Sequence, residues 1–214
     1  MKRRSGLKEV SPFLGGVCLV TDRKLCGLTC EEMARIALET GVGWIQYREK
    51  EKTRREIYHE AKRLRRLTAE YGATLVVNDH VDIALAVEAD GVHLGQDDLP
   101  LKEARRILGD RIIGISTHSL TQAADAEHDG ADYVGFGPVF FTTTKDAGEA
   151  KGLEMVSVIR RAVRIPVVAI GGISAENLSL VMEAGADAVA VASAVLKGDI
   201  SENVRSFMRI LRDG

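Results

Sequence analysis

The chain has 214 residues, of which 45% are hydrophobic and 28% are charged, and its formal net charge is −2. This length is short for two domains and sufficient for one well-buried core, and the composition is that of an ordinary globular protein. The near-neutral charge argues against general nucleic-acid binding, which requires a strongly basic face.

No long apolar run follows the basic segment 2–4, so we expect a cytoplasmic enzyme without a signal peptide or a membrane anchor. The odd number of cysteines, Cys18, Cys26 and Cys30, predicts reduced thiols in a reducing compartment. The alternative is a zinc site, formed by Cys26, Cys30 and either His59 or His80. The cysteines lack a paired metal-binding spacing, which favours ordinary thiols.

After a predicted N-terminal arm at residues 1–14, eight short apolar runs alternate with amphipathic segments. Each run has the length of a strand, and near-continuous apolar character predicts burial on both faces of a parallel sheet. Between the second and third runs, segment 53–71 spaces its apolar residues as one face of a helix does. The eight runs are 17–20, 44–47, 74–77, 91–94, 112–115, 133–136, 167–170 and 188–191.

A weak internal repeat marks four places where a helix should end and a strand begin: 41–44, 89–92, 130–133 and 185–188. The glycine in each copy suits the left-handed conformation of a helix C-cap. Eight strands with eight helical partners predict a single-domain (β/α)8 TIM barrel over residues 15–214. The alternative, a doubly wound open sheet, is weakened because no Gly-x-Gly-x-x-Gly follows the first run.

Polar residues at the ends of the runs point to a site, because the active site of such a barrel lies at the carboxyl ends of its strands. Gln46, Arg48 and Lys50 alternate along the end of the second run, so their side chains share one direction, into the barrel mouth. An amide and two cations there suit a polyanion and a heteroaromatic ring. The alternative is a solvated run of charges at a strand end.

Two carboxylates, Asp79 and Asp98, follow the next two runs. Carboxylates beside cations predict a hard metal ion, Mg2+, that is shared with substrate phosphates. Taken alone, either aspartate would be interpreted as a helix N-cap. Asp97 competes with Asp98 as the ligand.

Gly171 and Gly172 follow the seventh run, and Ser193 follows the eighth. The loops after these two strands form the usual phosphate site of (β/α)8 barrels, and backbone N–H groups at a helix N-terminus can bind a dianion. Ser174 is the predicted N-cap of the next helix. The alternative is that the glycines only serve a turn.

The long polar segment 140–152 follows the sixth run. It is interpreted as a lid that would carry Lys145 into the site. The alternative is a plain surface loop.

In these motifs and their order the chain resembles the thiamine-phosphate synthase family, from about the first run to Ser193 and beyond. The motifs that carry the resemblance lie at residues 46–50, 78–79, 90–98, 114–118, 130–135, 142–145 and 170–173. The chain departs from the family at Phe141, where proline is common, and at Ala192, where valine or isoleucine is usual.

The resemblance implies a transferase that joins a pyrimidine diphosphate to a thiazole phosphate, with one Mg2+ at each active site held by Asp79 and Asp98. The residues it implies for the pyrimidine diphosphate are Gln46, Tyr47, Arg48, Glu49, Lys50, Asn78, Ser116 and Lys145. Those it implies for catalysis are Arg48, Lys50, Ser116 and Lys145. Those it implies for the thiazole phosphate are Thr142, Thr143, Thr144, Gly172, Ala192 and Ser193.

The expected reaction starts with loss of pyrophosphate, whose charge the cations neutralise, and continues with attack by the thiazole nitrogen. The expected partners are these small molecules, not nucleic acid or a membrane, and a homo-oligomer is compatible with the sequence. The alternatives are a thiazole tautomerase paralogue, a non-catalytic barrel that binds thiamine precursors, and a sugar-phosphate isomerase on the same fold. The complete set of cations and carboxylates favours the synthase.

Overall fold

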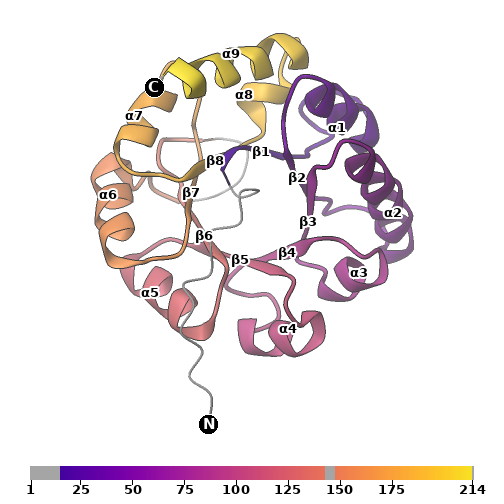
Figure 1. Ribbon diagram of the computed structural model, residues 1–214, viewed down its shortest axis with the longest axis horizontal. Coiled ribbons are helices and arrows are strands. Elements are labelled where there is room, and N and C mark those ends of the chain that lie inside the picture. The colour runs from indigo at the N-terminus through magenta and orange to yellow at the C-terminus, as the bar shows by residue number, and fades with distance from the viewer. Residues whose placement is uncertain (1–14, 143–147, 214) are drawn as a thin grey trace.

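The computed structural model describes residues 15–142 and 148–213. Eight parallel strands pair in sequential order and close into a barrel (Figure 1). This confirms the predicted TIM barrel, while the predicted arm at residues 1–14 lies outside the described residues. The strands are β1 Gly16–Val20, β2 Trp44–Tyr47, β3 Thr74–Asn78, β4 Gly91–Leu94, β5 Ile112–Thr117, β6 Tyr133–Phe136, β7 Val167–Ile170 and β8 Ala188–Val191.

Helices form a ring outside the strands (Figure 1). The described residues contain one helix more than predicted, because a short helix precedes the long last one after β8. Across the described ranges, none of the helices has the length and apolar character to cross a membrane. The helices are α1 Cys30–Glu39, α2 Arg54–Glu70, α3 Val81–Ala86, α4 Leu101–Leu108, α5 Leu120–Asp129, α6 Gly152–Ala162, α7 Leu178–Glu183, α8 Ser193–Leu196 and α9 Ile200–Asp213.

Local sequence explains where α2 begins. Thr53 and Glu56 form a capping box, in which each side chain binds the other residue's backbone N–H. The predicted apolar face then packs against the barrel, with Ile57, Leu64 and Leu67 all buried. The helical interpretation of segment 53–71 is therefore confirmed.

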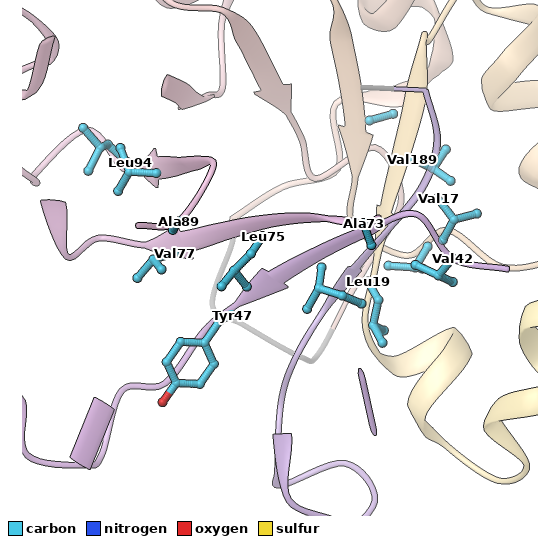
Figure 2. Close-up of a cluster of buried hydrophobic side chains, with 14 of the residues drawn as sticks. Val17, Leu19, Val42, Tyr47, Ala73, Leu75, Val77, Ala89, Leu94 and Val189 are labelled. Atoms are coloured by element: carbon cyan, nitrogen blue, oxygen red, sulfur yellow. The ribbon is translucent and has the colours of Figure 1, made fainter. Parts of the chain in front are cut away.

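Side chains that point outward from the strands form the main core between sheet and helices. Figure 2 shows part of it, including Leu19, Leu75 and Val189. Inward-pointing side chains fill the barrel itself, where the Trp44 and Tyr133 rings meet edge to face, 5.1 Å between centroids. Both residues begin their strands, so they close the amino-terminal end of the barrel and leave the carboxyl end for a site.

The predicted glycine caps are confirmed at Gly41, Gly130 and Gly185, which have φ of 108°, 95° and 100°. The prediction for the 89–92 copy is wrong. Gly91 lies inside β4, and a Cβ there would overlap the Ile112 carbonyl oxygen. Glu88 takes the left-handed conformation instead, with φ of 58°.

An aspartate just before β4, β6 and β8 ties the barrel together at its amino-terminal end. Each carboxylate accepts a backbone N–H, at 2.7–2.9 Å, from the first or second residue of the preceding strand. Each also forms an ion pair with an arginine of the helix layer. An arrangement repeated at this end of a TIM barrel contributes to stability and not to catalysis. The pairs are Asp90 with Arg65, Asp132 with Arg105 and Asp187 with Arg160.

The three cysteines are free thiols. Cys18 and Cys30 are buried, and burial raises the pKa of the Cys30 thiol to about 11. Among residues 15–142 and 148–213, no three His, Cys, Asp or Glu side chains gather as a metal site. The structure therefore gives no support to the zinc alternative.

Candidate active site

A cavity of ≈ 140 Å³ opens at the carboxyl end of the barrel. Its wall combines apolar side chains, glycines and a few polar groups, as small-molecule sites commonly do. The residues that line it come from the ends of β1, β2 and β5–β8 and from the loops that follow them. Those used below are Asp22, Arg48, Ser116, His118, Thr142, Ile170, Gly171, Gly172, Ile173, Ala192 and Ser193.

The second strand directs its predicted site residues to this mouth. The Gln46 side-chain Nε2 donates to Asn78 Oδ1 at 2.9 Å, across the top of β2 and β3. Arg48 lines the cavity, and its backbone N–H donates to Thr21 Oγ1 at 3.0 Å. Lys50, beyond the strand, forms an ion pair with Asp79. The alternation along the strand therefore brings the amide and the two cations to the same end.

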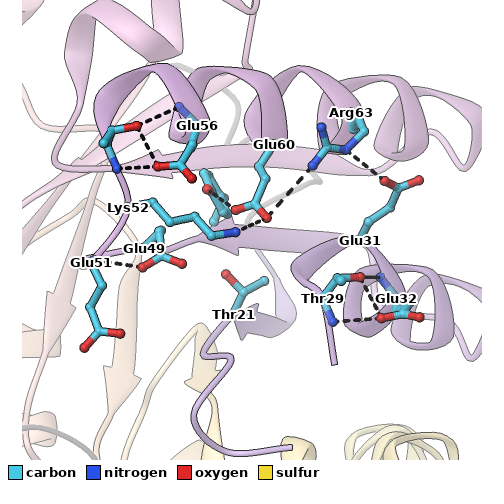
Figure 3. A network of polar contacts seen from close by, with 12 residues as sticks. Thr21, Thr29, Glu31, Glu32, Glu49, Glu51, Lys52, Glu56, Glu60 and Arg63 are labelled. Atoms are coloured by element: carbon cyan, nitrogen blue, oxygen red, sulfur yellow. Dashed lines mark hydrogen bonds and ion pairs between the residues drawn. The ribbon is translucent and has the colours of Figure 1, made fainter. Parts of the chain in front are cut away.

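Tyr47 points the other way, so its side chain gives no support to the predicted contact with substrate. Its ring is 1% exposed in the core outside the barrel (Figure 2), and its hydroxyl donates to Glu60 Oε2 at 2.7 Å. Burial and the Glu60 carboxylate raise the pKa of Tyr47 well above its usual value. Figure 3 shows Glu60 bound also by Lys52 and Arg63. Odd and even residues of a strand face opposite sides, so Tyr47 cannot share the direction of Gln46.

The predicted role of Glu49 in substrate binding also lacks support. Its Oε1 accepts the backbone N–H groups of Lys50, at 2.8 Å, and Glu51, at 2.9 Å. The contact with Glu51 is drawn in Figure 3. The carboxylate therefore shapes the loop that carries Lys50.

Asp79 and Asp98 lie side by side, as the metal hypothesis requires. Asp79 has a left-handed backbone, φ 64°, and its N–H donates to the His93 carbonyl oxygen at 2.9 Å. Asp98 Oδ2 accepts the Gly95 N–H at 2.6 Å. Burial raises the pKa of Asp98, the Gly95 N–H opposes this, and the hydrogen-bonded Asp79 carboxylate raises the pKa further.

Two adjacent carboxylates that repel each other at neutral pH fit a hard divalent cation, which prefers oxygen ligands. Asp97 is exposed and does not join them. In the segments that the structure describes, no third His, Cys, Asp or Glu completes the pair. The remaining ligands would have to be water and substrate oxygens, which is the usual arrangement for Mg2+ at phosphates. The left-handed backbone of Asp79 is strain of the kind found at functional sites.

Ser116, near the end of β5, connects the mouth with the barrel interior. Its Oγ lies 2.8 Å from His93 Nε2, and His93 Nδ1 lies 2.8 Å from the Tyr133 hydroxyl. The Ser116 carbonyl oxygen accepts from Gln96 Nε2 at 2.6 Å. The sequence hypothesis placed Ser116 at the substrate.

The turn after β7 is built from glycine for two reasons. Gly171 and Gly172 have φ of 100° and 64°, and a Cβ on Gly172 would lie 2.5 Å from the Phe141 carbonyl oxygen. The predicted N-cap Ser174 is wrong, because α7 begins at Leu178 with Asn177 as its N-cap. Asn177 instead supports the turn, donating from Nδ2 to the Gly172 carbonyl oxygen at 3.0 Å.

Ala192 and Ser193 line the same cavity as Gly172, so the structure brings these three predicted phosphate-site residues together. Thr142 joins them from the loop after β6. Thr143, Thr144 and Lys145 lie outside the described residues, and their roles stay predictions, as does the lid. Phe141, a departure from the family pattern, is 80% exposed at the cavity edge.

Sequence reasoning assigned no role to two polar residues of the cavity, Asp22 and His118. Each follows a strand within two residues, which is the signal that could have found them. His118 Nδ1 lies 2.6 Å from the Gly137 carbonyl oxygen. A carbonyl oxygen only accepts, so Nδ1 carries a hydrogen.

Comparisons with known proteins agree with this geometry. Residues 17–195 match the family model described as thiamine monophosphate synthase. The chain is 50% identical to thiamine-phosphate synthase of Chloroflexus aurantiacus over 183 residues, which cover 85% of each chain. It is 45% identical to thiamine-phosphate synthase of Dictyoglomus thermophilum over 205 residues, which cover 90% of this chain and 92% of the relative. The solved thiamine phosphate pyrophosphorylase of Pyrococcus furiosus superposes with a TM-score of 0.87 at 44% identity, over 92% of this chain and 96% of that one. The chain belongs to the thiamine monophosphate synthase family.

Proposed function

We propose that this chain condenses 4-amino-2-methyl-5-hydroxymethylpyrimidine diphosphate with 4-methyl-5-(2-phosphooxyethyl)thiazole to give thiamine phosphate and pyrophosphate. One observation carries the proposal beyond family membership. The barrel mouth has two different halves: a cluster of Lys50, Asp79 and Asp98, and the part of the cavity with apolar walls at Gly172 and Ser193. Arg48 and Ser116 line the same cavity. A reaction that joins two phosphorylated heterocycles needs such a pair of sites.

The first half suits the diphosphate. Lys50 and Arg48 supply positive charge, and the paired aspartates are the residues that would hold Mg2+. When bound, Mg2+ would neutralise charge on the diphosphate as it leaves. The hydrogen-bonded amides of Gln46 and Asn78 offer donors and acceptors to the aminopyrimidine ring beside it.

The second half suits the thiazole phosphate. Backbone N–H groups at glycine turns and helix starts bind phosphate, and Gly172 and Ser193 meet in this cavity. Ile170 and Ile173 give it the apolar wall that a thiazole ring requires. Thr142 contributes a hydroxyl at the open edge.

The chemistry then requires positioning and no nucleophilic side chain. The bond from the pyrimidine methylene carbon to the diphosphate oxygen breaks, and its electron pair leaves with pyrophosphate. The thiazole nitrogen donates its lone pair to that carbon. Arg48 and Lys50 stabilise the departing charge, and the walls of the cavity exclude water from the electron-poor carbon.

The direct test is incubation of the purified chain with both substrates and Mg2+, followed by mass spectrometry for thiamine phosphate. We expect one equivalent of pyrophosphate for each thiamine phosphate. A reaction without the thiazole phosphate is the control for simple hydrolysis. Proton exchange in the thiazole without coupling would indicate the tautomerase alternative, and binding without any product would indicate the non-catalytic barrel.

A further inference from the structure

A chain of two hydrogen bonds runs from the packed interior of the barrel to its mouth. The Tyr133 hydroxyl lies 2.8 Å from His93 Nδ1, and His93 Nε2 lies 2.8 Å from Ser116 Oγ. Tyr133 is 1% exposed and His93 8% exposed, while Ser116 lines the cavity. Only the last member of the chain can touch a ligand.

The fold makes room for both rings. A Cβ on Gly114 would overlap the Tyr133 ring, and a Cβ on Gly135 would lie 2.8 Å from His93 Cε1. Trp44 holds Tyr133 edge-on from the other side, and the His93 and Tyr133 rings are stacked 5.4 Å apart. Both rings are therefore closely packed, which restrains the two hydrogen bonds.

The buried hydroxyl of Tyr133 sets the direction of the chain. Burial raises the pKa of Tyr133 well above its usual value, so the phenol keeps its hydrogen. In the described part of the chain, His93 Nδ1 is its one hydrogen-bond partner. If Nδ1 carried a hydrogen, the phenol hydrogen would be buried without an acceptor, which is unfavourable.

The favoured arrangement is therefore Tyr133 O–H to His93 Nδ1, then His93 Nε2–H to Ser116 Oγ. A serine hydroxyl whose oxygen already accepts from Nε2 has its own hydrogen available for the mouth. Ser116 would then present a donor, in a fixed place, to an acceptor atom of the ligand.

We propose that Tyr133 and His93 are positioning residues that hold Ser116 as a hydrogen-bond donor to the diphosphate or ring nitrogen of the pyrimidine substrate. This rests on the proposed function for the identity of the ligand. It assigns a role to two residues that do not themselves reach the substrate.

The first test measures the tautomer of His93 by 15N NMR of the wild-type protein, with its resonances assigned by their absence from His93→Gln. We expect a protonated Nε2 and an unprotonated Nδ1. A protonated Nδ1, in either the other tautomer or the imidazolium, would overturn the proposal. This measurement does not depend on synthase activity, so it distinguishes failure of the inference from failure of the proposed function.

The second test is a double-mutant cycle on kcat/KM with Tyr133→Phe and Ser116→Ala. We expect Tyr133→Phe to lower kcat/KM about fivefold to tenfold when Ser116 is present and less than about twofold in the Ser116→Ala background. Tyr47→Phe is the matched control, because it removes an equally buried hydroxyl outside the barrel and should leave kcat/KM unchanged. Equal losses in both backgrounds would mean that Tyr133 acts only through general stability, and the positioning role would be rejected.

Discussion

Replacing Gly172 by alanine tests whether the turn after β7 positions the thiazole-phosphate half of the mouth. Gly172 has φ of 64°, and an added Cβ would meet the Phe141 carbonyl oxygen at 2.5 Å and the Phe140 Cβ at 2.7 Å. Gly72, at the end of α2, is a matched control. Its φ is 62°, and an added Cβ there meets no atom within 4 Å.

The two substitutions share one energy term and differ in a second. A left-handed alanine costs about 1–2 kcal/mol, and the loss of unfolded-state freedom returns about 0.4–1 kcal/mol, so Gly72→Ala should lower the free energy of unfolding by about 1 kcal/mol. Gly172→Ala adds an overlap with backbone, and overpacking costs about 1–3 kcal/mol more. The loop can relieve this overlap by moving, which would displace Thr142 on the cavity wall.

Urea unfolding measures the difference in stability, and steady-state kinetics at saturating pyrimidine diphosphate measure whether the loop has moved. We expect Gly172→Ala to be at least about 1 kcal/mol less stable than Gly72→Ala, or to raise KM for the thiazole phosphate at least about fivefold if the loop moves instead. Gly72→Ala should not change KM. The reasoning is refuted if the two variants match in both stability and KM.

Three further predictions concern the metal site and the chemical step. Asp79→Ala and Asp98→Ala should each depress turnover strongly while the fold survives, and full activity in excess chelator would contradict a metal role. Asp98→Asn should raise the melting temperature of metal-free protein near pH 7. Burial and Asp79 raise the folded-state pKa of Asp98 from 3.8. Ionisation of Asp98 therefore destabilises the fold above that raised pKa and has no effect well below pH 3.8. A melting temperature of Asp98→Asn below that of the wild type would contradict this prediction. Replacing the pyrimidine methyl group by trifluoromethyl should slow single-turnover chemistry, about tenfold for each ~1.4 kcal/mol of added barrier, and near-equal rates would exclude departure of pyrophosphate before attack.

The sequence determined the architecture because its signals are local. Eight apolar runs of strand length needed burial on both faces, and all eight are strands of the closed barrel. The polar residues that follow them had to gather at one end, since parallel strands share their carboxyl ends. Asp79 and Asp98 meet for this reason, although 18 residues lie between them along the printed chain.

Tyr47 shows that a run of site residues can be interpreted too broadly. The alternation that directs Gln46 into the barrel also directs Tyr47 toward the helices, and treating residues 46–50 as one binding motif overlooked it. Ser174 is different, because serine before a helix is a common cap and the chain uses Asn177 instead.

What only the tertiary structure decided is which side chains become partners across the barrel. Tyr133, His93 and Ser116 come from three adjacent strands, and their contacts depend on the register in which His93 pairs with Gly114 and Ser116 pairs with Gly135. The alternation along a strand decides which side of the sheet a residue faces. Which residue of the neighbouring strand lies beside it depends on the stagger with which all eight strands close into the barrel. That stagger is a property of the whole ring, so no local segment encodes it. The space at Gly114 and Gly135, where two rings fit, became visible only when the ring was closed.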